Sequence, residues 1–280
     1  MTDVQASLDA LSRLPGVAES ADAARAACTR LRFDEVLRRR IPEAAAESRI
    51  RGAHASAALD GADLPLDVVR DRVRGAVAWP DPADPVDEVV RAAAQATAET
   101  EHHVGLVFTA PLQVLARLHV AAMAGLLPPE QVGRPRQGDE TSRELVDLGD
   151  APGPAEVAAR LADVAAVLTA PRRAPVAVVA GLVHAELASM RPFVRGNGIV
   201  ARAMERLVVI AGGLDPTGVA VLEVGHGASG GPAYLGALTA YVTGGARGVG
   251  LWLEHCAEAV TIGAQEGERI CAAIRVGRLT

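Results

Sequence analysis

Hydrophobic residues recur at helical spacing along almost the whole chain. Apolar positions three or four residues apart, as in AVVAGLVHAELASM and AMERLVVIAGG, are typical of amphipathic or buried α-helices. Proline and glycine pairs such as Pro15-Gly16 and Pro128-Pro129 separate these runs. The predicted helices are Val4–Leu14, Ala18–Arg39, Glu43–Leu59, Leu66–Ala78, Val86–His103, Leu112–Ala124, Ala155–Leu168, Val176–Met190, Ile199–Ile210, Ala233–Val242 and about Gly250–Ile274.

Strand signals are poor. The one candidate is ETSRELVDLGD, Glu140–Asp150, which the turns GRPRQ and APGPA flank and which could form a small hairpin. Neither an internal repeat nor a low-complexity linker divides the chain. The pattern predicts one all-α domain, with residues 1–40 as an N-terminal helical extension.

Composition sharpens this picture. The 280 residues are 50% hydrophobic but only 2% aromatic, so the core is expected to consist of Ala, Val and Leu, which favour close helix packing. All 28 basic residues are Arg, which we attribute to codon bias in a GC-rich genome. The presence of an arginine therefore says little about function, and only its position in the sequence is informative.

Charge and cysteine usage exclude several classes of protein. The net charge is −6 and there is no basic tail, which argues against a dedicated nucleic-acid binder. Three scattered cysteines without CxxC fit a reduced cytoplasmic compartment. The N-terminus lacks the order of a signal peptide, and His184 and Glu186 interrupt the longest apolar run, so no membrane association is expected. Exposed Ala/Leu faces would allow a homodimer.

The stretch RPFVRGNGIVAR, Arg191 to Arg202, joins two apolar runs. It carries three arginines, and no carboxylate lies between Glu186 and Glu205. Gly196-Asn197-Gly198 opens a predicted helix, where backbone N–H groups favour an anion. Arg202 falls in the first turn of that helix, where a cation opposes the helix dipole. Arg202 is therefore expected to have an anionic partner.

Asp60 is also unfavourably placed relative to a helix dipole, with the opposite charge at the opposite end of a helix. It ends a predicted helix just before Gly61, where a carboxylate opposes the dipole. Both misplacements are resolved if Asp60 pairs with Arg202. Ser56 stands four residues before Asp60 on the same helical face. The helix that ends at Asp60 is therefore predicted to dock on the start of the helix that bears Arg202.

These residues resemble a known family. MRPFVRGNGIVAR resembles the active-site loop of Fic-domain (Fido) proteins, His-Pro-Phe-x-(Asp/Glu)-Gly-Asn-Gly-Arg-x-x-Arg, and SAALDG resembles their inhibitory motif, (Ser/Thr)-x-x-x-Glu-(Gly/Asn). GRPR, Gly133–Arg136, is similar to the Gly-x-x-Arg that leads into the flap of these proteins. GPAYLGAL and GLWLEHCAEAV look like their C-terminal Tyr and Trp segments. The ordered blocks run from about Ile41 to Ile274.

The resemblance implies a Fic-type helical bundle at 41–280, with an inhibitory-type helix at 43–60, a small β-hairpin flap at about 133–150 and the active-site loop at 191–202. The implied activity is transfer of AMP from ATP to a hydroxyl of a target protein. By the same resemblance, Asp60 and Ser56 would be inhibitory. The residues that would bind the nucleotide or its phosphates are Phe193, Arg195, Gly196, Asn197, Gly198, Arg202 and Arg136.

The sequence departs from the family at the chemical positions. Arg191 takes the place of the catalytic His, and a guanidinium cannot act as a base near neutral pH. Arg195 takes the place of the acid that would hold Mg²⁺, and a cation there repels the metal. Ile199 replaces the first motif Arg. Ordinary transfer is therefore expected to be lost, and Mg²⁺ is not expected.

Three functions remain open from the sequence. The first is a sensor or pseudoenzyme that binds ATP, another nucleotide or another anionic small molecule without Mg²⁺. The second is an active transferase with altered chemistry, in which the arginines replace the metal electrostatically; His184 is the nearest other histidine, although it is expected to face the core. The third is a non-catalytic helical module that binds a protein partner.

Overall fold

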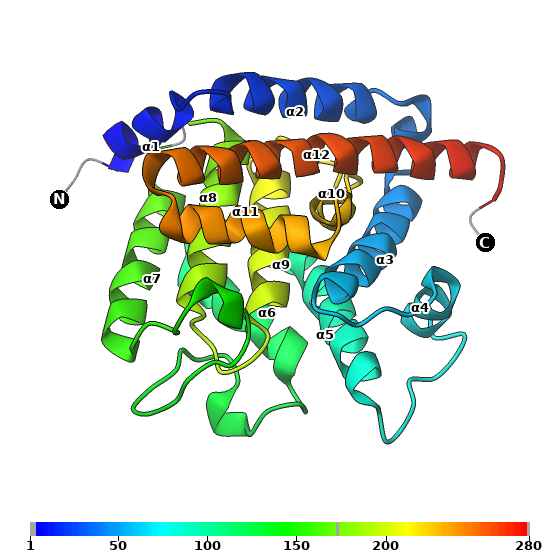
Figure 1. Cartoon of the computed structure of the whole chain (residues 1–280). Helices are drawn as coiled ribbons and strands as arrows, with labels where there is room; N and C mark the ends of the chain where they lie inside the picture. The colour runs from blue at the N-terminus through cyan, green and yellow to red at the C-terminus, as the bar shows by residue number, and fades with distance from the viewer. Residues whose placement is uncertain (1–3, 172–173, 279–280) are drawn as a thin grey trace.

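The computed structural model describes residues 4–171 and 174–278, and in these ranges the chain is all-helical (Figure 1). None of the helices it describes combines the length and apolar character needed to cross a bilayer. The α-helices are α1 Val4–Ser12, α2 Val17–Arg32, α3 Ile41–Leu59, α4 Leu66–Val73, α5 Pro85–Glu99, α6 Pro111–Met123, α7 Pro154–Thr169, α8 Val176–Met190, α9 Asn197–Ala211, α10 Leu222–Gly227, α11 Gly231–Thr243 and α12 Gly245–Arg275; the short 3-10 helices are η1 Glu35–Arg38, η2 Thr100–His103, η3 Pro129–Gln131 and η4 Val146–Leu148.

Helices α8 and α9 form the centre of the molecule. Both are buried around nearly their whole circumference, which matches sequences that are apolar on all sides. The long α12 and α2 run side by side across one end of the bundle, and α3 and α5 lie beside α9 on one flank (Figure 1). The loop between α8 and α9 therefore emerges from the best-packed part of the fold.

Small residues let the helices approach closely, as the composition predicted. A Cβ atom added to Gly225 in α10 would lie 2.1 Å from the backbone oxygen of Ala259 in α12. The N-terminal helices share the core of the rest of the chain, since Leu8, Val17 and Leu31 are buried in the same cluster. The Ala-rich and Gly-rich faces thus set the distances between helices.

Most predicted helices are present with small changes at their ends. The run Ala18–Arg39 divides into α2 and η1, and the run Leu66–Ala78 ends at Val73. Helix α10 was not predicted, because its six residues LEVGHG contain two glycines and span less than two helical turns. Short elements of this kind are stabilised by tertiary packing and leave little periodic signal.

The predicted β-hairpin at 133–150 is wrong. The described residues of this segment form turns and η4, and contain no strand. Two buried arginines supply the donors that a partner strand would have supplied. Arg136 donates to the carbonyls of Glu140 and Pro152, and Arg191 donates to those of Glu144, Leu145 and Gly149. The backbone acceptors are satisfied without a strand ladder.

Candidate functional site

The end of α3 meets the start of α9, as predicted. Arg202 Nη2 lies 2.8 Å from Asp60 Oδ2, Nε donates to Ser56 Oγ at 2.8 Å, and Nη2 donates to the Ser56 carbonyl at 3.0 Å. A Cβ at Gly198 would lie 3.0 Å from Asp60 Oδ1, so the glycine permits this close approach. The predicted pairing is confirmed as a contact, but the placement of Arg202 in the first turn is wrong, because α9 begins at Asn197 and Arg202 is its sixth residue.

This ion pair joins a buried cation to a partly exposed carboxylate. The Arg202 side chain is 1% exposed, whereas that of Asp60 is 25% exposed. Burial by itself disfavours the guanidinium charge, but Asp60 and Tyr234 outweigh it and raise the pKa of Arg202. The remaining nitrogen, Nη1, is buried without a hydrogen-bond partner among the described residues and lies beside Gly198. Arg202 therefore keeps one free donor next to the loop.

The Gly-Asn-Gly loop is rigidly shaped. Gly196 precedes α9 at φ 87°, a left-handed conformation, and a Cβ there would lie 2.6 Å from Met123 Cε. The Asn197 side chain closes the turn, since Oδ1 accepts from the Phe193 N–H and Nδ2 donates to the Phe193 carbonyl, both at 2.9 Å. The backbone N–H groups of Gly196 and Asn197 are thereby fixed at the helix N-terminus.

A carboxylate of the chain itself occupies these donors. Glu144 Oε1 accepts from the Gly196 N–H at 2.7 Å, and Oε2 accepts from the Asn197 N–H at 2.8 Å and from Asn197 Nδ2 at 2.9 Å. Burial raises the pKa of Glu144, and these hydrogen bonds only partly offset it. In this structure the donors of the loop are therefore occupied by the Glu144 carboxylate.

The other loop arginines have partners of their own. Arg191 is buried, and its guanidinium donates to three backbone carbonyls of the segment 144–149. Its backbone is left-handed at φ 47°, as is that of its partner Leu145 at φ 50°. Arg195 pairs with Glu88 at 3.1 Å on the rim, and its side chain is 35% exposed. Arg195 is the loop arginine that solvent reaches.

Two predicted phosphate contacts lie elsewhere. Arg136 is buried and, besides its bonds to Glu140 and Pro152, donates to the carbonyl of Arg191 at 2.8 Å. Phe193 is buried and stacks on His119, with ring centroids 3.7 Å apart. Neither side chain lines the cavity beside the loop. Both instead hold the loop in place.

A cavity of 330 Å³ opens beside the loop, at the lower end of the range for small-molecule pockets. Its polar side chains are three carboxylates, from Asp60, Glu144 and Asp147, and one guanidinium, from Arg195. Because Asp60 already pairs with Arg202, the cavity has little spare positive charge. The apolar side chains that line it are Leu59, Val89, Ala92, Met123, Leu126, Leu145, Val146, Ile199 and Leu235.

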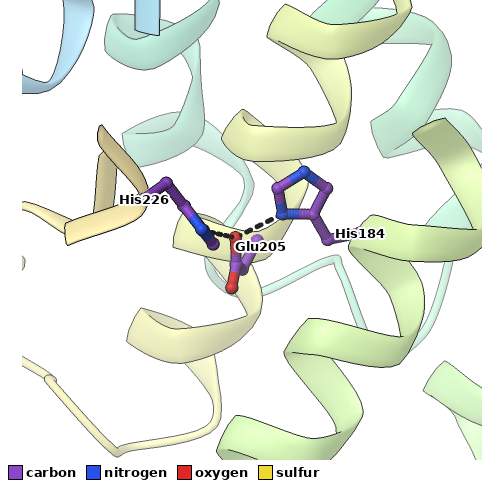
Figure 2. Close-up of side chains that lie close together, drawn as sticks. All are labelled: His184, Glu205 and His226. Atoms are coloured by element: carbon purple, nitrogen blue, oxygen red, sulfur yellow. Dashed lines mark hydrogen bonds and ion pairs between the residues drawn. The ribbon is translucent and has the colours of Figure 1, made fainter. Parts of the chain in front are cut away.

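A buried polar cluster lies beneath Arg202. Figure 2 shows His184 and His226 turned toward Glu205, whose Oε2 lies 2.6 Å from His184 Nδ1 and 2.7 Å from His226 Nε2. His184 Nε2 also contacts the Tyr234 hydroxyl at 2.8 Å, and the Arg202 guanidinium lies 6.0 Å from the Tyr234 ring centroid. The cluster is therefore linked through Tyr234 to the surroundings of the Arg202 guanidinium.

These three residues are also a group that could hold a metal ion, since their ligand atoms lie within 4.8 Å of one another. The short N···O distances are those of direct hydrogen bonds. Burial opposes the charge of Glu205, but His226 and His184 outweigh it and lower the pKa of that carboxyl. In this arrangement the carboxylate itself ties the two imidazoles together.

The fold and the loop together define an all-α protein of Fic type. Residues 109–209 match the model of the Fic/DOC family, a span that runs from the start of α6 through the loop into α9. This part of the chain is therefore similar to the Fic/DOC family. No curated protein matches the chain.

Three solved structures share the fold. A Fic family protein from Desulfovibrio desulfuricans G20 is 18% identical, with a TM-score of 0.70 over 95% of this chain and 76% of that one. Fic-1, residues 134–508, from C. elegans is 17% identical, with a TM-score of 0.63 over 93% and 73%. A Fic domain containing signaling protein from Bacteroides thetaiotaomicron VPI-5482 is 12% identical, with a TM-score of 0.60 over 91% and 98%.

Several site residues were missed by sequence reasoning. Glu144 was seen only as part of a supposed strand, although it is the carboxylate that the loop binds. His226 was assigned to a loop at the pocket rim, whereas it is fully buried in α10. Burial of His184 was expected and is confirmed. A lone acid or histidine in a polar stretch gives no periodic signal, so only its tertiary neighbours reveal its role.

Proposed function

We propose that this protein is a degenerate Fic-like sensor that does not carry out ordinary AMP transfer. Its loop binds an oxyanion without Mg²⁺, and its own carboxylates hold it closed. The observation that carries the proposal is Glu144 on the Gly196 and Asn197 amides, because it supports an oxyanion-binding role for the loop in this chain. The ligand would be a nucleotide phosphate, as the resemblance implies, or another anion.

Loss of transfer follows from the side chains at the two chemical positions. Arg191 stays protonated and is committed to three backbone carbonyls, so no base stands where the family places its His. Arg195 adds a cation where the family places a metal-binding acid. His184 is fully buried and bonded to Glu205 and Tyr234, which disfavours it as a replacement base.

Closure is proposed to involve two carboxylates. Asp60, at the end of the inhibitory-type helix α3, neutralises Arg202, and Glu144 fills the backbone donors next to it. A ligand must displace at least one of them. In this proposal residues 1–40 are a helical extension of the Fic-like domain 41–280.

Incubation of the purified chain and a cell lysate with ATP labelled at the α-phosphate, with and without Mg²⁺, tests the loss of transfer. We expect no covalent label on any protein from the wild type or from Asp60→Gly. A label that depends on the chain would replace the proposal by an active transferase with altered chemistry.

The triple variant Asp60→Gly/Arg191→His/Arg195→Asp restores the base and the acid and removes the opposing carboxylate. Labelling by this variant, if it is folded, is expected because the pocket scaffold is retained. A folded triple variant that neither labels protein nor binds ATP would count against a nucleotide site.

A further inference from the structure

The side chain that fills the loop identifies the chemistry that the loop prefers. Glu144 presents two oxygens to three donors, the N–H groups of Gly196 and Asn197 and Asn197 Nδ2, at 2.7–2.9 Å. Both oxygens of a planar carboxylate are thus used. A tetrahedral phosphate of higher charge has no matching set of further donors here, because Arg191 is bound to carbonyls and Asp60 already holds Arg202.

The charges around the cavity point the same way. Asp60, Glu144 and Asp147 line it with the single guanidinium of Arg195, which itself pairs with Glu88. Like charges repel more strongly at the effective dielectric of a protein surface than they do in bulk water. A ligand with several negative charges is therefore disfavoured. A ligand with one negative charge that replaces the Glu144 carboxylate leaves the balance unchanged.

The remaining lining favours an apolar body. Nine of the lining side chains are aliphatic, Ala or Met, and they surround 330 Å³ of space beside the loop. Gly198 also lines this cavity, and the buried Arg202 Nη1 lies behind it, close to where a Cβ on Gly198 would stand. Arg202 does not itself line the cavity, so the donors that a ligand meets there are the backbone amides of the loop and Asn197 Nδ2.

The Glu144 side chain can leave the loop donors while the backbone of the segment 144–149 stays in place. Arg191 holds the carbonyls of Glu144, Leu145 and Gly149, so the backbone stays anchored while the side chain rotates outward. The Glu144 side chain itself lines the cavity, and its departure adds space beside the donors it vacates.

We infer that this cavity takes a small monocarboxylate with an apolar body, whose carboxylate replaces that of Glu144 on Gly196 and Asn197. This rests on the proposed oxyanion-binding function and names the ligand class. No bond is made or broken: the step is exchange of one carboxylate for another.

Titration of the full chain with octanoate, followed calorimetrically and by the amide resonances of Gly196 and Asn197, tests this. Glu144→Ala removes the internal competitor, so octanoate should bind at least tenfold more tightly than to the wild type and should shift both amides. Asp139→Ala is the matched control, because it removes an exposed carboxylate from the same segment, 133–150. It should bind octanoate as tightly as the wild type does.

Leu235→Trp fills the cavity from its partly exposed wall and should abolish octanoate binding while the melting temperature and helix content are kept. Octylamine and octyl phosphate, with the same apolar body, and ATP are the comparison probes. We expect octylamine not to bind, and octyl phosphate and ATP to bind Glu144→Ala at least tenfold more weakly than octanoate.

The outcomes separate the two proposals. If phosphate-bearing probes shift the Gly196 and Asn197 amides of Glu144→Ala and octanoate does not, the ligand class is wrong and the oxyanion-binding function stands. If no anion shifts them although the variant is folded, the oxyanion-binding function itself is wrong. Octanoate that binds equally to wild type and Glu144→Ala, or that binds without moving these amides, also overturns the inference.

Discussion

At the scale of single residues, the site is built from arginines that are each committed to another partner. Arg202 forms an ion pair with Asp60 and a hydrogen bond with Ser56. Arg191 donates to three backbone carbonyls, and Arg195 forms an ion pair with Glu88. All three arginines therefore hold parts of the chain in place. The two non-glycine residues with positive φ, among those described, are Arg191 and its partner Leu145. Strained backbone is therefore found where the segment 133–150 contacts the loop 191–202.

Arg191→His should loosen the 144–149 segment. The shorter imidazole loses the guanidinium donors to the carbonyls of Glu144, Leu145 and Gly149. We expect faster amide hydrogen exchange and faster proteolytic cleavage in this segment, each by about tenfold, equivalent to about 1.4 kcal/mol of local stability. Arg143→His, at an exposed neighbouring position, should leave both rates unchanged. Unchanged rates in Arg191→His would show that these bonds do not hold the segment.

Asp60→Ala should destabilise the fold by about 1–3 kcal/mol in urea unfolding. It leaves the buried Arg202 without a carboxylate partner, and the partial exposure of Asp60 keeps the cost below that of a fully buried pair. Asp63→Ala, whose side chain is 83% exposed, is the control and should change stability by less than about 0.5 kcal/mol. Equal effects of the two substitutions would contradict a structural role for the ion pair.

At the scale of elements, close helix approach through glycine fixes where the site forms. Helix α10 lies against α12 at Gly225, and α3 meets α9 at Gly198. Because α10 carries His226 and Glu223, its position also sets the buried partners of Glu205 and Arg206 in α9. Helix contacts far from the loop therefore orient the side chains beneath it.

Gly225→Ala should cost about 2–3 kcal/mol of unfolding free energy, because its Cβ would lie 2.1 Å from the Ala259 carbonyl oxygen and the two helices must separate. Gly227→Ala, in the same helix and with open space around the added Cβ, should be neutral or slightly stabilising. Similar melting temperatures for the two variants would rule out close packing at Gly225.

At the scale of the whole molecule, neutral buried histidines make stability depend on pH. Burial lowers the pKa of His119 and His255 to about 4. His119 contacts both the segment 133–150 and the loop 191–202. Its Nδ1 accepts from the Gly133 N–H at 2.8 Å, and its Nε2 contacts the Arg195 carbonyl at 3.0 Å. Protonation of Nδ1 would break the first of these bonds.

Because the folded-state pKa values lie below the ordinary value of 6.5, the unfolded chain binds protons first as the pH falls. The stabilisation is complete above about pH 6.5 and is lost between there and about pH 4, by up to about 3 kcal/mol for each group. Urea unfolding at pH 7, 6 and 5 should show this fall. His119→Gln should flatten it, and His102→Gln, at an exposed position, should not.

The helical architecture, the position of the loop and the Asp60–Arg202 contact could be predicted from the sequence. Hydrophobic spacing and charges placed against helix dipoles are local properties, so they can be read along the chain. The tertiary structure alone decided that Glu144 fills the loop, that Arg191 replaces a strand ladder and that His184, Glu205 and His226 meet. Those contacts join segments up to 53 residues apart through side chains whose reach and direction depend on packing, which spacing does not encode.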